Sequence, residues 1–147
     1  MKKIITAISL LFLLGACNEL PVKIRASIVA DKTVNPNVAR RASPVELRIY
    51  HLRNAQRFNK AGYFSLLNYD TKVLGSDLLR KEAMIVRPGQ KIPYKTDAHK
   101  QTKYLAVFAA FRVHSRPYWK AIKRTSAFKM EYTTIVLSRN QVLFQDP

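Results

Sequence analysis

Apolar and polar residues alternate through several short segments of the chain, and this period of two is typical of β-strands with one covered face. In 22–31 the apolar positions Val22, Ile24, Ala26, Ile28 and Ala30 lie on one side, and Lys23, Arg25, Ser27 and Asp31 lie on the other. The same alternation predicts a second strand over 45–53. Shorter stretches bounded by proline, glycine or polar runs predict further strands at 84–87, 91–95, 118–122, 132–137 and 142–145.

The most apolar segment after residue 20 is 104–111, which is apolar on both faces. Such a run is either a central strand covered on both sides or a short buried helix, and its length and its Tyr, Val and Phe content favour the strand. The small residues Ala106 and Ala110 share one face, where they leave room for another element to pack.

The pattern changes between about residues 54 and 81, where β-branched residues are few and Ala, Leu and Phe are common. Asn54 is a candidate cap for a short helix that Gly62 ends, and 63–67 and 76–80 predict two further helical turns. We therefore expect a mainly β fold, a two-sheet sandwich of seven or eight strands over 22–147 with a small helical insertion at about 54–81.

A long segment without apolar periodicity, 32–43, separates the first two predicted strands. It contains Asn35-Pro36-Asn37 and Arg40-Arg41, which are typical of an exposed loop. Loops of this length inside a compact domain are often functional, although a merely solvated loop is the alternative. A shorter loop is predicted at 112–117, and a basic connection at 123–129.

The first seventeen residues have the layout of a secretory signal. Lys2 and Lys3 precede an uncharged apolar run, 4–14, that is too short to cross a bilayer as a helix, and the small residues Gly15 and Ala16 lead to the only cysteine, Cys17. Leu14-Gly15-Ala16-Cys17 resembles a bacterial lipobox. That resemblance implies removal of 1–16, acylation of Cys17 and a lipidated tether at 17–21. The alternative is a free or buried thiol beside an ordinary cleavage site.

The residue after the cysteine is Asn18 and not aspartate, which by analogy with Gram-negative sorting implies the outer membrane, with the domain in the periplasm. Without 1–16 the chain keeps 24 basic against 9 acidic residues, a net charge of +15. A periplasmic address excludes nucleic acid as a plausible partner. The remaining candidate partners are acidic protein surfaces, anionic lipid headgroups, lipopolysaccharide and the acidic groups of the cell wall. The alternative is that the basic surface is merely solvated.

Catalytic and metal-binding patterns are missing from the sequence. His51, His99 and His114 are far apart, without metal-ligand spacing, and we expect each at the surface or at a strand edge. There is no Gly-x-Ser-x-Gly elbow and no glycine-rich phosphate loop. We therefore expect no enzyme, no metal, no small-molecule substrate and no cofactor beyond the covalent lipid at Cys17; a periplasmic hydrolase would need groups that converge only in space.

Several segments occur in a recognisable order and spacing, namely Ser43-Pro44-Val45-Glu46-Leu47-Arg48-Ile49-Tyr50-His51-Leu52, Phe58…Ala61…Phe64…Leu67 with Asp70 and Leu74-Gly75-Ser76-Asp77-Leu78, Pro88-Gly89, 104–112 and Trp119. Together with the lipobox, this set resembles the outer-membrane lipoprotein of type VI secretion systems (the TssJ, VasD or SciN type). The resemblance implies a transthyretin-like β-sandwich tethered to the outer membrane. It also implies a structural role, binding the periplasmic C-terminal region of the large inner-membrane component.

The resemblance further implicates the loop after the first strand in that contact. Here the loop differs from the family's common pattern, because Ala39-Arg40-Arg41-Ala42 stands where a glycine often precedes the Ser-Pro. The predicted partner-binding residues are Val34, Asn35, Asn37, Val38, Arg40 and Arg41, with the 112–118 loop as a second patch. The alternative function is a periplasmic lipoprotein that binds lipopolysaccharide or peptidoglycan through its basic surface.

Overall fold

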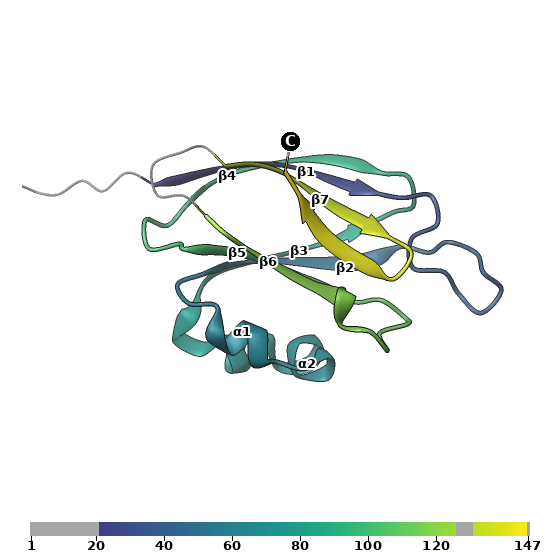
Figure 1. Cartoon of the computed structure of the whole chain (residues 1–147), viewed down its shortest axis with the longest axis horizontal. Helices are drawn as coiled ribbons and strands as arrows, with labels where there is room; N and C mark the ends of the chain where they lie inside the picture. Colours follow the sequence, from purple (N-terminus) through teal and green to yellow (C-terminus); the bar gives the residue numbers. More distant parts are fainter. Residues whose placement is uncertain (1–20, 126–130, 147) are drawn as a thin grey trace, which may run out of the picture.

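Two four-stranded β-sheets pack face to face in the computed structural model, which describes residues 21–125 and 131–146 (Figure 1). One sheet has the order β4-β1-β7-β8, with β1 at Val22–Ala30, β4 at Lys91–Ala98, β7 at Glu131–Ser138 and β8 at Gln141–Gln145. The other has the order β3-β2-β5-β6, with β2 at Val45–Leu52, β3 at Leu78–Val86, β5 at Tyr104–Ala109 and β6 at Lys120–Arg124. The predicted mainly β, two-sheet sandwich is confirmed.

The helical insertion forms a third layer that covers the outer face of the β3-β2-β5-β6 sheet (Figure 1). It consists of α1 (Gln56–Lys60), α2 (Tyr63–Leu74) and the single 3-10 turn η1 (Gly75–Asp77). Asn54 accepts a hydrogen bond from the Gln56 N–H at 3.0 Å, just before α1 begins. In the described part of the chain, no helix is both long and apolar enough to span a bilayer.

The core between the sheets comes from alternate positions of each strand, as the period of two predicts. Ile24 and Ile28 of β1 face Leu47 and Ile49 of β2, and all four are fully buried. β5 is buried on both faces because the helices cover its second face: the Phe108 ring lies 5.4 Å from that of Tyr63 in α2. The interpretation of 104–111 as a central strand is therefore confirmed, although the strand ends at Ala109.

Some predicted boundaries are wrong. The strand predicted at 91–95 continues as β4 to Ala98, because its last residues still pair with β1. Segment 76–80 contains no second helical turn beyond η1, because Leu78 already pairs with Leu52 and β3 then runs along the whole of β2. Segment 118–122 does not begin as a strand, because Pro117 opens a second 3-10 turn, η2 (Pro117–Trp119), and β6 starts at Lys120. Of the predicted basic connection, 123–124 belong to β6 and 126–130 lie outside the described residues, as do the signal segment 1–16 and Cys17.

A buried ionic cluster joins the helical layer to β2 and β3. The Asp70 carboxylate of α2 accepts hydrogen bonds from the Tyr50 hydroxyl at 2.9 Å and from Arg48 Nη1 at 3.0 Å, and Lys81 Nζ lies 2.7 Å away. Burial alone would raise the pKa of Asp70, but the bonds from Lys81, Tyr50 and the Thr71 amide hold it below the ordinary value. The ionised Asp70 carboxylate therefore attaches α2 to strands β2 and β3 through these hydrogen bonds and ion pairs.

Replacing Asp70 by alanine is expected to lower the free energy of unfolding by roughly 3 kcal/mol, because the buried Tyr50 hydroxyl loses its acceptor and Arg48 keeps only one of its two counter-ions, Glu46 at 2.7 Å. Asp97→Ala is the matched control, since Asp97 is exposed and lies 3.6 Å from Arg25, and it should cost under about 1 kcal/mol. Urea denaturation of both variants measures the difference. Equal losses of unfolding free energy in the two variants would contradict the role of the Asp70 cluster in attaching the helical layer to the sheet.

One histidine departs from the expected surface position: His51 is fully buried between the sheets. Its Nε2 lies 2.9 Å from the Tyr94 hydroxyl of β4, which donates to Glu82 at 2.8 Å. Burial lowers the pKa of His51 to about 4, the nearby Glu82 opposing and Arg80 reinforcing the shift. The imidazole is therefore neutral in the folded protein at neutral pH.

Acid is expected to destabilise the fold through His51. Well above pH 6.5 the imidazole is neutral in both states. As pH falls through 6.5 toward 4, only the unfolded chain binds the proton, so stability declines by on the order of 3 kcal/mol. His51→Gln removes the titration and keeps a polar side chain of similar size. Urea midpoints at pH 7 and pH 4.5 should differ less for this variant than for the wild type. An unchanged difference would contradict the assignment.

Candidate binding surface at one end of the sandwich

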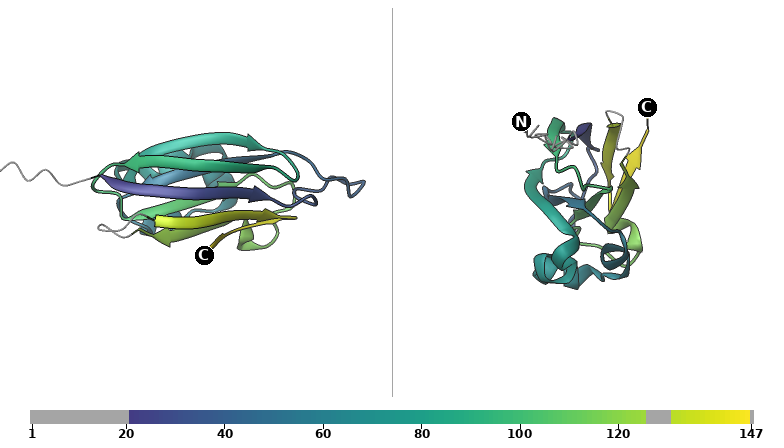
Figure 2. Two further views of the ribbon diagram at one scale, coloured as in Figure 1. Left: turned by 90° about the horizontal axis from the view of Figure 1, so that it is seen from above. Right: turned by 90° about the vertical axis from the view of Figure 1, so that its left-hand side faces the viewer.

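Four connections meet at the end of the sandwich that is opposite the first residue of β1, Val22. They are the 31–44 loop, the β3–β4 turn 87–90, the 110–119 segment and the β7–β8 turn 139–140, and together we name them the loop end. The strand register places them there, because Ala30 at the end of β1 pairs with Leu137 near the end of β7. The 31–44 loop extends beyond the sheets (Figure 2).

Asn35 fastens three of these connections together. Its Nδ2 donates to the Pro44 carbonyl at 2.8 Å, its Oδ1 accepts from the Arg112 N–H at 2.9 Å, and its own N–H donates to the Arg139 carbonyl at 2.6 Å. Asn35 is buried and has a positive φ of 48°, a conformation that asparagine adopts more readily than most residues. The amide side chain therefore sets the positions of the neighbouring loops.

Replacing Asn35 by alanine is expected to destabilise the protein by roughly 2–3 kcal/mol, because two partly buried backbone groups lose their partner and alanine is strained at positive φ. Asn37→Ala is the control: Asn37 also accepts two backbone hydrogen bonds, but they are exposed, and the expected loss is about 1 kcal/mol or less. Thermal unfolding of the two variants separates these cases. Similar losses of stability in the two variants would contradict the role of the Asn35 hydrogen bonds in holding the loops together.

The tip of the long loop is a tight turn built around Asn37. Its Oδ1 accepts from the N–H groups of Ala39 at 3.0 Å and Arg41 at 2.9 Å, and Arg40 takes a positive φ of 58°. This turn directs the side chains outward: Val38 is fully exposed, and Arg40 and Arg41 are exposed. An exposed valine on the same turn as two exposed arginines is a surface suited to a protein partner.

The six residues that the sequence selects thus divide into two groups. Val34 and Asn35 are buried and hold the loop, whereas Asn37 forms the turn that presents Val38, Arg40 and Arg41. The 112–118 loop, selected as a second patch, lies next to this loop through the Asn35–Arg112 bond. Sequence reasoning did not find Arg139, because only the strand pairing brings the β7–β8 turn to the same end.

Positive charge dominates the loop end. It carries seven cationic side chains, namely Lys32, Arg40, Arg41, Arg87, Arg112, Arg116 and Arg139, against one carboxylate, that of Asp31. Hydrogen bonds from the Thr33 N–H and hydroxyl, at 2.7 and 2.9 Å, engage that carboxylate and lower the pKa of Asp31. The three non-glycine residues with positive φ in the described chain, Asn35, Arg40 and Arg139, all lie here. A surface of this charge attracts an acidic partner.

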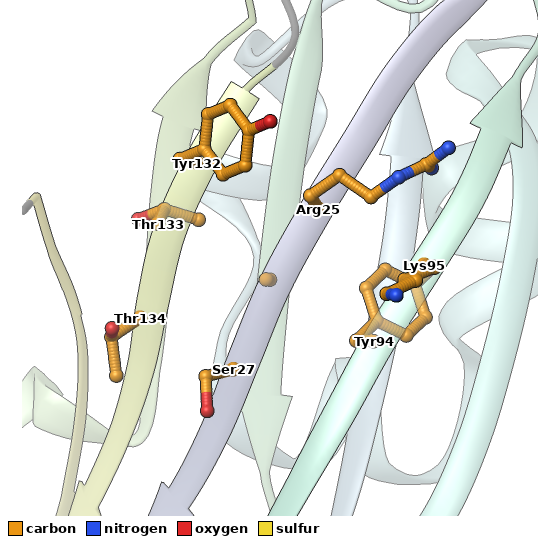
Figure 3. A pocket seen from close by; sticks show the side chains of 8 residues that line it. Arg25, Ser27, Tyr94, Lys95, Tyr132, Thr133 and Thr134 are labelled. Atoms are coloured by element: carbon orange, nitrogen blue, oxygen red, sulfur yellow. The ribbon is translucent and has the colours of Figure 1, made fainter.

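A hollow of about 290 Å³ lies over strands β4, β1 and β7 (Figure 3). Its cations are Arg25 and Lys95. The Arg25 guanidinium donates to the carbonyl oxygens of Ile24 and Thr96 and lies 3.6 Å from Asp97, so it is already engaged with the β4 side. This hollow therefore offers an anion less free charge than the loop end does.

The described residues provide little for catalysis or metal binding. Over 21–125 and 131–146, no three His, Cys, Asp or Glu side chains gather into a group that holds a metal ion. The buried ionisable groups, Asp70 and His51, serve the packing of the helices and of the core.

Comparison with known proteins agrees with this architecture. Residues 22–140 match the family model described as "Type VI secretion lipoprotein, VasD, EvfM, TssJ, VC_A0113". The chain belongs to this family of type VI secretion lipoproteins. A search of curated proteins finds no match.

Solved structures of this lipoprotein family share the fold. TssJ1 from Pseudomonas aeruginosa matches with a TM-score of 0.82 and 26% identity, over 86% of this chain and 98% of that one. Lip from Serratia marcescens, a membrane-bound component of the type VI secretion system, matches with a TM-score of 0.75 and 22% identity, over 86% and 99%. The eight-strand sandwich with its helical layer is therefore the fold of the lipoprotein family.

Proposed function

We propose that this lipoprotein is anchored in the outer membrane through acyl chains on Cys17 and that its loop end binds the periplasmic C-terminal region of the large inner-membrane component of the secretion system. It thereby helps to assemble the membrane complex. The role is one of contact and assembly, without catalysis. The partner contacts are made by Val38, Arg40 and Arg41, and Val34, Asn35 and Asn37 hold the loop in place.

The observation that most supports this proposal is that Val22, where the tether joins the fold, and the loop end lie at opposite ends of the sandwich. β1 begins at Val22, close in sequence to Cys17, and its nine residues span about 30 Å before the loop end starts. A tether of five residues reaches at most about 18 Å. An acylated Cys17 thus leaves the basic, apolar-tipped loop free to face away from its own membrane.

The descriptions of two similar structures are consistent with the proposed inner-membrane partner. A chain in a structure described as "Type VI membrane complex" matches with a TM-score of 0.76 and 20% identity, over 86% of this chain and 99% of that one. A chain in a structure described as "T6SS protein TssM C-terminal domain (869-1107) from EAEC" matches with a TM-score of 0.74 and 19% identity, over 85% and 98%. These matches show the shared fold, and their descriptions are consistent with assembly onto an inner-membrane component.

Co-purification tests the proposal. The full-length lipoprotein, tagged at its C-terminus and solubilised from cell envelopes in mild detergent, is expected to retain the inner-membrane component at stoichiometric levels. Lipopolysaccharide or peptidoglycan recovered in its place would favour the alternative, a lipoprotein that binds the envelope through its basic surface. Recovery of neither would contradict both assignments.

A further inference from the structure

A separate hollow of about 460 Å³ lies at the loop end between the 112–118 loop and the β7–β8 turn. Val113 and Tyr118 line it with apolar surface and are 48% and 52% exposed. Arg116 and Arg139 line it with exposed guanidinium groups, and no acidic residue takes part. The hollow therefore combines apolar and cationic surface within one concavity.

Asn140 adds a specific polar feature to this hollow. Its Oδ1 is buried and has no hydrogen-bond partner within the described residues. A buried acceptor without a donor is unfavourable, and a bound group that supplies an N–H recovers that loss. The backbone N–H of a peptide is such a donor.

We propose that this hollow binds an extended acidic segment of the protein that contacts the loop tip. One carboxylate of the segment lies between Arg116 and Arg139, one apolar side chain packs on Tyr118 and Val113, and one backbone N–H donates to Asn140 Oδ1. The inference rests on the proposed function, since it assigns a second contact to the same protein partner.

The composition of the hollow favours a peptide over a lipid phosphate. A phosphate needs charge and donors, but makes no use of the exposed valine and tyrosine or of an unpartnered amide oxygen. The hollow also lies at the end opposite Val22. One partner can reach hollow and loop tip together, because Asn35 is bonded to both Arg112 and Arg139 beside the hollow.

The test uses Arg116→Gln combined with Arg139→Asn, in the detergent-solubilised full-length lipoprotein. Asparagine suits position 139, where φ is 41°, and the Arg139 carbonyl that Asn35 uses is kept. The matched control is Lys103→Gln with Arg124→Gln, two exposed cations at the opposite end. The measurement is the dissociation constant for the purified periplasmic C-terminal region of the inner-membrane component, at two salt concentrations.

The hollow variant is expected to bind at least tenfold more weakly, with a smaller salt dependence, while the control binds as the wild type does. If the hollow variant binds normally while charge reversal at Arg40 and Arg41 abolishes binding, the hollow proposal is overturned and the proposed function stands. If the wild-type protein does not bind this region at all, both are overturned.

A photo-crosslinking residue in place of Tyr118 identifies the occupant in cells, independently of any change in affinity. Tyr118 is half exposed, so the substitution is compatible with the fold. The expected product is a crosslinked peptide of the inner-membrane component with Asp or Glu within a few residues of the attachment point. Attachment to lipopolysaccharide, or to a segment without acidic residues, would overturn the proposal.

Discussion

Replacement of Cys17 by serine is expected to move the protein from the membrane fraction to the soluble periplasmic fraction almost completely. The prediction follows from the lipobox-like Leu14-Gly15-Ala16-Cys17 and from family membership, since the hydroxyl of serine does not take the place of the thiol that is acylated. Several acyl chains on one residue anchor a protein stably, whereas a single chain binds only marginally. Fractionation followed by immunoblotting measures the shift.

Asn18→Asp is the matched control for this experiment. It keeps the cysteine and its lipid, so the protein should remain bound to membrane, but by analogy with Gram-negative sorting it should move to the inner membrane. Mass spectrometry of the wild-type protein should show acylation at Cys17. A protein that stays membrane-bound with an unmodified Cys17 thiol would contradict the lipid anchor. Its attachment to the membrane would then have to come from its basic surface.

Charge reversal at the loop tip is expected to weaken partner binding by about two orders of magnitude or more. Arg40→Glu, Arg41→Glu and Val38→Asp replace the exposed cationic and apolar groups of the tip and leave Val34 and Asn35 in place. Arginine is enriched among the few interface residues whose removal costs about 2 kcal/mol or more, and reversed charges add repulsion against an acidic partner. Calorimetric titration against the periplasmic C-terminal region of the inner-membrane component measures the loss.

Two controls separate this effect from loss of fold or of total charge. Lys60→Glu with Lys72→Glu makes a similar charge change on the exposed side of the helical layer and should leave affinity nearly unchanged. The melting temperature of the tip variant should equal that of the wild type, because the changed side chains make no buried contacts. Equal weakening by both charge variants would mean that binding depends on overall charge and not on the tip.

The sandwich can be predicted from the sequence because most of its strands carry their own local signal. The alternation in 22–31 and 45–53 predicts which residues of β1 and β2 face the core, and the structure confirms these core faces. The alternation does not predict that the second face of β2 is also covered, where Tyr50 is buried against α2. The start of β3 could not be predicted in the same way. Residues 78–80 resemble a helical turn locally, and only their pairing with β2 at the far end of the sheet makes them extended.

Only part of the candidate site could be predicted from the sequence. Proline, asparagine and the two adjacent arginines predict an exposed loop at 32–43, and the structure places the tip in solvent. The inward direction of Val34 and Asn35 depends on hydrogen bonds to segments that are about 80 and 100 residues further along the chain. Arg139 joins the site only through the parallel pairing of β1 with β7, which has no local signature.

Hydrogen exchange of the lipoprotein, measured with and without the inner-membrane component, tests directly whether the loop end is the binding surface. We expect protection on binding in the backbone amides of 33–43, 112–118 and 139–141, and no change in the helical layer 56–77. Protection confined to the helices, or to the outer face of the β4-β1-β7-β8 sheet, would contradict the assignment of the loop end as the binding surface.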